Sequence, residues 1–344
     1  MESRWIRWPV QLLVVGLVVW LLVVPKVVAS RTSLHLLFDV DSQWIAIATG
    51  AELASLVGFA LATRALLARR TRPAAHQVLR IDLSTIALSH CLPGGSAAGT
   101  ALGIRLLTRA GVPVADASFT KIAQGLGSAL VLQALLVVAL LLRVLLGSRS
   151  GWAVWPLVAE IALVVAGFST ATMVQLVRKR RRHSLGAPPT QTSPRLRRLR
   201  ARLDHGVRVL GAQLTSLQRD PRRLSTATSW VVTNWLFDAA ALWAALRAYG
   251  HPLPVDGVLL AFALANTLAW LPFSPSGLGL SDALLVPALI ALGAGRADAV
   301  LGVITWRLLS FWLPIPLGLA SYGSLRVQSR RVSRRAAHAQ IHPS

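Results

Sequence analysis

Six charged residues lie inside long apolar stretches of this 344-residue chain, where a charged side chain costs several kcal/mol in a membrane. Such residues typically mark binding sites, ion paths or proton relays, so they are the first candidates for chemistry. The six are Glu52, Lys121, Glu160, Asp238, Asp282 and Arg307.

Arg307 is the strongest of these candidates. It lies about a third of the way into the last apolar stretch, too deep for its side chain to reach the membrane surface easily. We therefore expect an acidic partner or a lipid phosphate beside it. Asp238 could be that partner, either as a structural salt bridge or as part of a site. Glu52 and Lys121 rank lower, because each lies within a few turns of an expected helix end.

Two Pro-Gly interruptions provide candidates of another kind, since free backbone amides at a restarting helix can bind a phosphate oxygen. Asp282 follows the second interruption, where its carboxylate could cap a helix as readily as it could bind a ligand. Gly and Pro also occur at simple kinks. The residues of the two breaks that we include in a substrate-binding site are Pro93, Gly94, Gly95, Pro275, Ser276, Gly277 and Gly279.

The elements that must hold these residues are expected to be membrane helices. Hydrophobic residues make up 54% of the chain and the mean hydropathy is +0.57. Because one span needs about 20 apolar residues, the sequence predicts an all-α, polytopic helical membrane protein with about six full spans and two re-entrant or broken segments. A signal peptide is the competing interpretation of the first stretch. The expected spans are 9–29, 44–67, 114–146, 152–177, 225–248 and 297–325, and the broken segments are 81–107 and 257–292.

The formal net charge of +23 is explained by the expected membrane topology, which places most basic residues on one side of the membrane. The segment 178–224 carries 14 basic and 2 acidic residues, and the tail 327–344 is also basic. The positive-inside rule places both on the cytoplasmic side of a plasma membrane, with both termini there. The 178–224 loop could bind nucleic acid by charge alone, but it lacks interleaved aromatic residues, so we expect it to contact anionic lipid instead.

The sequence offers little support for an enzymatic function. The single cysteine, Cys91, excludes a disulfide framework and a thiolate metal cluster, and we expect no metal or cofactor. An aspartyl dyad of Asp238 and Asp282 is conceivable, yet the surrounding sequence is not of the protease kind. We therefore expect a protein that is not an enzyme.

The chain also resembles a duplication at an offset of 182 residues. Pro93 and Gly95 fall on Pro275 and Gly277, and a Gly-x-x-x-Ala-Asp-Ala pattern recurs at Gly111 and Gly293. Each expected half, 10–146 and 152–325, contains an odd number of crossings, so the second half would be inverted. Inverted repeats with broken helices are typical of transporters. Gly, Ala and Pro align easily in membrane helices, which leaves a chance match open.

These residues resemble the lysylphosphatidylglycerol synthase transmembrane-region family, also called flippase-like, over about 10–326. The most specific motifs run from Pro272 to Asp282 and from Arg307 to Gly318. The resemblance implies an integral-membrane domain that moves phospholipids, notably aminoacylated ones, between leaflets. Two departures from the family pattern are Asp282, where glutamate is usual, and Gly125, where the first repeat commonly has an arginine.

Together these observations predict a translocator of phospholipids or lipid-linked substrates. In it, Arg307 binds an anionic headgroup, and Asp282, with Asp238, balances or recognises its cationic part. The expected partner is an anionic or aminoacylated phospholipid. The alternative is a non-transporting scaffold that serves a separate synthase, since no soluble synthetase domain accompanies the membrane domain.

Overall fold

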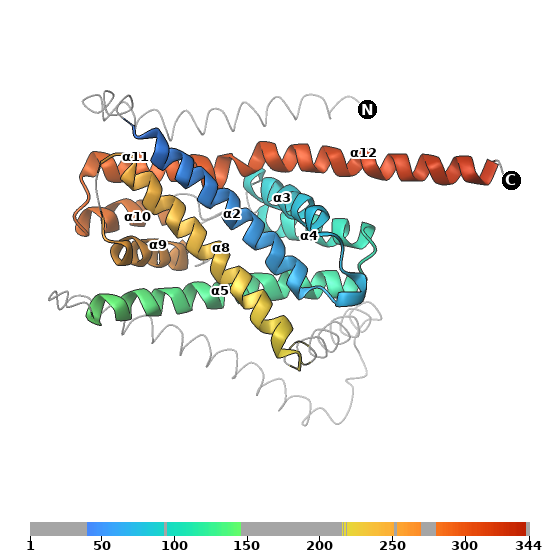
Figure 1. Ribbon diagram of the computed structural model, residues 1–344, viewed down its shortest axis with the longest axis horizontal. Helices are drawn as coiled ribbons and strands as arrows, with labels where there is room; N and C mark the ends of the chain where they lie inside the picture. Colours follow the sequence, from blue (N-terminus) through green and yellow to red (C-terminus); the bar gives the residue numbers. More distant parts are fainter. Residues whose placement is uncertain are drawn as a thin grey trace, which may run out of the picture.

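The computed structural model describes residues 40–92, 95–145, 215, 217, 219–250, 253–269 and 280–341. Every regular element in these ranges is a helix, which confirms the predicted all-α class (Figure 1). The expected spans 9–29 and 152–177, the residue Glu160 and most of the 178–224 loop lie outside the described residues.

Two antiparallel helices, α2 (Ser42–Leu66) and α8 (Pro221–Arg247), cross the centre of the molecule side by side (Figure 1). The side chains of Asp41 and Asp220 cap their first turns, which is where helices prefer such residues. Trp44 near the start of α2 meets Trp243 near the end of α8, with ring centroids 5.3 Å apart. Small residues such as Gly58, whose missing side chain accommodates the α8 backbone, allow this close approach.

The first broken segment forms a helical hairpin. Helix α3 (Ala75–Cys91) ends at the predicted interruption and α4 (Gly95–Arg109) begins after it. On α4, Gly95, Gly99 and Gly103 lie on one face at intervals of four residues, and a Cβ atom at any of them would collide with α3 or with the Lys121 side chain. These glycines therefore permit backbone-to-backbone packing.

The second broken segment contains α9 (Val255–Ala269) and α10 (Leu280–Ala291), with the interruption itself outside the described residues. The α3–α4 and α9–α10 hairpins lie at opposite ends of the central α2–α8 pair (Figure 1). Each hairpin is followed by a long helical rod, α5 (Val114–Leu145) or α11 (Arg296–Arg307) continuing into α12 (Pro314–Ile341). A π-helical segment, Leu308–Trp312, joins α11 to α12.

Three of the described helical stretches are long and apolar enough to cross a bilayer: Ser42–Leu66, Val114–Arg143 and Arg296–Gln328. They coincide with three of the expected spans. Helix α8, the expected span 225–248, is long enough but more polar. Several of its polar side chains bond to other helices, among them Asn234, whose amide donates to the Ser55 carbonyl at 3.1 Å. Neighbouring helices thus satisfy groups that lipid could not.

The turns after the two hairpins repeat the same hydrogen bonds at the 182-residue offset. Gly111 and Gly293 adopt left-handed φ angles of 91° and 102°. The amide of Val112 donates to the Leu107 carbonyl, as the equivalent Ala294 does to Leu289. Both are helix-ending turns of the Schellman kind, which require a residue such as glycine at positive φ. These equivalent bonds, with the antiparallel α2 and α8, support the inverted repeat; the boundaries 10–146 and 152–325 stay a prediction.

The two halves exchange packing partners. Helix α3 of the first half packs along α12 of the second, where Gly318 lies against the Leu83 carbonyl and Ala87. In the same way α9 of the second half packs on α5 of the first, in a cluster that includes Leu136 and Leu260. Among the described residues, the two halves therefore share parts of their cores.

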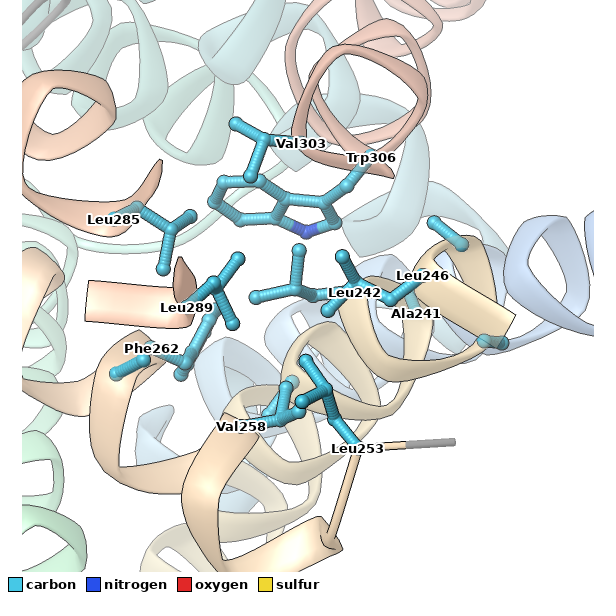
Figure 2. Close-up of a cluster of buried hydrophobic side chains, with 14 of the residues drawn as sticks. Ala241, Leu242, Leu246, Leu253, Val258, Phe262, Leu285, Leu289, Val303 and Trp306 are labelled. Carbon is cyan, nitrogen blue, oxygen red and sulfur yellow. The ribbon is translucent and has the colours of Figure 1, made fainter. Parts of the chain in front are cut away.

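The largest buried cluster lies where α8, α9, α10 and α11 meet. Figure 2 shows the Trp306 indole of α11 among Leu242 of α8, Phe262 of α9 and Leu285 of α10. Trp306 is 1% exposed and is the largest fully buried side chain among the described residues. Its position brings the end of α11, and with it Arg307, against α8.

Candidate functional site

The candidate site begins with Trp306 and Asp238. The indole Nε1 of Trp306 donates a hydrogen bond of 2.8 Å to Oδ1 of Asp238. Asp238 lies midway along α8 and is half-buried. Since an indole N–H can only donate, this bond assigns the Oδ1 oxygen of Asp238 as an acceptor.

Arg307 follows Trp306 at the end of α11, and its guanidinium carbon lies 4.4 Å from the centroid of the Trp306 ring. This cation–π contact holds the guanidinium beside the core while leaving it half-buried. The positive charge of Arg307 lies close enough to act on both the Asp238 carboxylate and the His90 imidazole. The structure therefore brings together Arg307 and Asp238, the two residues that the sequence suggested as partners.

Glu52 lies behind Asp238, on α2. Its side chain is 3% exposed and is hydrogen-bonded to the Asp238 carboxyl group. One of its oxygens, Oε2, is buried and has no hydrogen-bond partner within the described structure. A buried oxygen left in this state is costly unless a proton, an ion or another group meets it. We define these two acidic residues, Glu52 and Asp238, as the acidic pair.

His90 completes the described part of the site from α3, one residue before that helix ends. Its ring stacks on Phe311 with centroids 4.2 Å apart, and its Nδ1 lies 2.9 Å from the Phe311 carbonyl oxygen. Because a carbonyl only accepts, Nδ1 carries the hydrogen and Nε2 is left to accept. Phe311 lies in the π-helical segment, and π-bulges often occur at functional sites.

The remaining predicted site residues are placed only in part. Asp282 is the third residue of α10, in the first turn of a restarting helix as expected, and its side chain lies outside the described residues. The Gly95 amide donates to the Leu92 carbonyl at 2.8 Å, so this amide serves the turn. Outside the described residues are Pro93, Gly94, Pro275, Ser276, Gly277 and Gly279.

The position of Glu52 near an expected helix end made it a weaker candidate, and no pattern in the sequence pointed to His90. The internal repeat could have pointed to Glu52. The equivalent residue 182 positions later is Asn234, which lies one helical turn from Asp238 on the same face of α8. His90 had no such signal, since its partner Phe311 is 221 residues away.

A second polar cluster lies in the first half and is more deeply buried. The Lys121 Nζ lies 2.5 Å from Oδ1 of Asp82, and the two side chains are 5% and 1% exposed. Gln124 joins the cluster and accepts a hydrogen bond from Thr63 at 2.8 Å. Gln124 is the repeat equivalent of Trp306, whereas Gly125 is the equivalent of Arg307, so the arginine is not duplicated.

The chemistry of the site fits the binding of a charged headgroup. A half-buried guanidinium can bind phosphate oxygens through several donors, and the acidic pair supplies a region of opposite charge behind it. Among the described residues, no group of three His, Cys, Asp or Glu side chains is arranged to hold a metal ion.

Comparison with known families gives one match. The family model described as "Lysylphosphatidylglycerol synthase TM region" matches residues 8–318, which include the first expected repeat, most of the second and the whole candidate site. A search of curated proteins found no matching relative.

Proposed function

The chain belongs to the lysylphosphatidylglycerol synthase TM region family, and from this premise we propose that it is a flippase-like translocator of phospholipids or lipid-linked substrates. Membership in this family and its apolar helices make it a membrane protein connected with lipids. The proposal adds that lipid crosses between the leaflets and that the protein performs no covalent chemistry.

The observation that carries this proposal is the position of Arg307. It lies inside the 33-residue apolar stretch Arg296–Gln328, yet it is half-buried, held over Trp306 and close to Asp238. A cation kept at this depth needs an anionic ligand or partner, because lipid tails cannot solvate it. A phospholipid phosphate meets this need.

The acidic pair suggests which headgroups fit. An anionic phosphate at Arg307 would place the rest of the headgroup toward Asp238. A headgroup with an ammonium group, such as an aminoacylated one, would then pair with the carboxylate. Within the proposal, the membrane is a bacterial-type plasma membrane with both chain termini on its cytoplasmic side.

Reconstitution in liposomes tests the proposal. The full chain would be inserted into vesicles containing a fluorescent phospholipid, and the fraction of label accessible to an external quencher would be followed over time. Wild-type protein should make label from the inner leaflet accessible, and Arg307→Ala should reduce the rate at least tenfold. Arg307→Lys should retain part of the rate, because it keeps the charge but loses the bidentate geometry.

Arg326→Ala is the matched control. Arg326 lies over an aromatic ring, 5.1 Å from the centroid of Tyr322, but it is exposed and far from the site. This variant should translocate lipid at the wild-type rate. If wild-type protein moves no label across several headgroup classes, the translocator proposal is wrong.

The scaffold function remains the second candidate because of one observation. Gly125, the repeat equivalent of Arg307, has no neighbouring atom within 4 Å of the position where a side chain would begin. The arginine of the site thus has no equivalent at this position of the first half, which a non-transporting partner of a separate synthase would tolerate. Such a scaffold would leave lipid distribution in the vesicles unchanged.

A further inference from the structure

The acidic pair has a property that the binding of a lipid phosphate alone does not explain. Two carboxyl groups in direct contact within a protein interior cannot both be ionised without strong repulsion, so they share a proton. Glu52 provides the inner group and Asp238 the outer one. The Glu52 Oε2 oxygen has no partner within the described structure, so a position for a further proton is present.

Arg307 determines how many protons the pair holds. With one shared proton the pair carries a single negative charge, which the Arg307 guanidinium balances among the described groups. A phosphate bound to Arg307 adds a negative charge next to the pair. One more proton, taken from the acid form of the buffer in solution onto a carboxylate oxygen, restores neutrality.

From this arrangement we propose that the acidic pair takes up one proton when a lipid with an anionic phosphate and no cationic group binds at Arg307, so that lipid binding and proton binding favour each other. The inference rests on the translocator function and deepens it, because it provides a coupling ion. By linkage, each ligand must raise the affinity for the other by the same factor. A translocator with this property would move anionic lipid together with a proton.

The other charged groups near the acidic pair do not take the role of Arg307 in coupling phosphate binding to proton binding. His90 on α3 faces Arg307, and its ring is held by Phe311. On α5 and α3, Lys121 and Asp82 bind each other next to Thr63, three helical turns from Glu52 along α2. The α9 and α10 residues that share the buried cluster with Trp306, such as Phe262 and Leu285, are apolar. Among the described groups, Arg307 is therefore the charge that an arriving phosphate would compensate.

Calorimetric titration of the full chain in detergent tests the inference. A short-chain phosphatidylglycerol would be titrated at one pH in two buffers with different ionisation enthalpies, which gives the number of protons taken up per lipid bound. Wild-type protein should take up about one proton per lipid. The double variant Glu52→Gln with Asp238→Asn, which leaves no carboxyl group in the pair, should take up almost no protons per lipid bound, whereas Glu52→Gln alone should still take up a proton on Asp238. Asp256→Asn, in a separate ion pair with Arg143, should behave like the wild type.

A second measurement requires only the wild-type protein. If one proton accompanies each lipid, the lipid affinity should fall by up to tenfold for each unit by which the pH rises. Lipid binding without proton uptake and without pH dependence would overturn the inference and leave the translocator function standing. A lack of any lipid binding would instead overturn the proposed function.

Discussion

The indole of Trp306 and the carboxylate of Asp238 join α11 to α8 through a hydrogen bond of 2.8 Å between residues 68 positions apart. This bond lies at the edge of the largest buried cluster and directly beside Arg307. It therefore connects the packing of the second half to the charge distribution of the site.

Trp306→Phe should destabilise the protein by about 2 kcal/mol, because a hydrogen bond to a charged acceptor is lost. Trp235→Phe is the matched control, since the Trp235 indole donates to the neutral Ser128 hydroxyl at 2.9 Å and its loss should cost about 1 kcal/mol. Unfolding in denaturant measures both. Equal losses of stability in the two variants would show that the hydrogen bond to Asp238 contributes no more than a bond to a neutral acceptor.

Lys121→Met should cost about 3 to 5 kcal/mol, because it leaves the Asp82 carboxylate buried without its counter-charge. The double variant Lys121→Met with Asp82→Leu should recover much of that loss, since no charge then remains buried. Arg143 and Asp256 form a control pair with side chains 19% and 17% exposed. A double-mutant cycle on this more exposed pair should give at most about 1 kcal/mol. Additive losses at Lys121 and Asp82 would contradict the prediction.

Gly99→Ala should lower the stability by about 1 to 3 kcal/mol, because the added methyl group would collide with the Ser89 side chain and the Thr85 carbonyl of α3. Gly127→Ala, in helix α5 with no atom within 4 Å of the new methyl group, should instead be stabilising by up to about 1 kcal/mol. Thermal unfolding in detergent separates the two variants. If Gly99→Ala left the stability unchanged, α3 and α4 could move apart without a loss of stability.

Val114 and Arg296 begin α5 and α11, and they are exposed equivalents at the 182-residue offset. In a Cys91→Ser background, Val114→Cys should react with an impermeant thiol reagent only from the cytoplasmic side. Arg296→Cys should react only from outside, because the second half is inverted. Labelling of whole cells and of inverted vesicles measures the two sides. Reaction of both cysteines from one side would exclude the inverted repeat.

Much of the fold could be predicted from the sequence because its signals are local. The length of the apolar stretches predicted the positions of α2 and α5. The Pro-Gly interruption at 92–96 predicted where α3 ends and α4 begins. The repeat offset also aligned residues that make the same turn bonds, such as Val112 and Ala294.

The site was only partly predictable because its contacts depend on tertiary packing. The proximity of Asp238 and Arg307 followed from the need to compensate charge within apolar helices. That need does not reveal that Trp306 donates to Asp238, or that Glu52 lies behind it. It also did not identify Asp82 as the partner of Lys121, since many positions could have supplied the carboxylate.

The exchange of helices between the halves affects how the protein can be made. The Ser84 hydroxyl of α3 lies 3.4 Å from the Gly318 carbonyl of α12, across 234 residues of sequence. At synthesis rates of about 10 residues per second, the ribosome needs roughly 20 s after α3 to complete that partner. During this interval the α3–α4 hairpin has an uncovered face, so nascent-chain protection by the insertion machinery would be needed until almost the last helix has emerged.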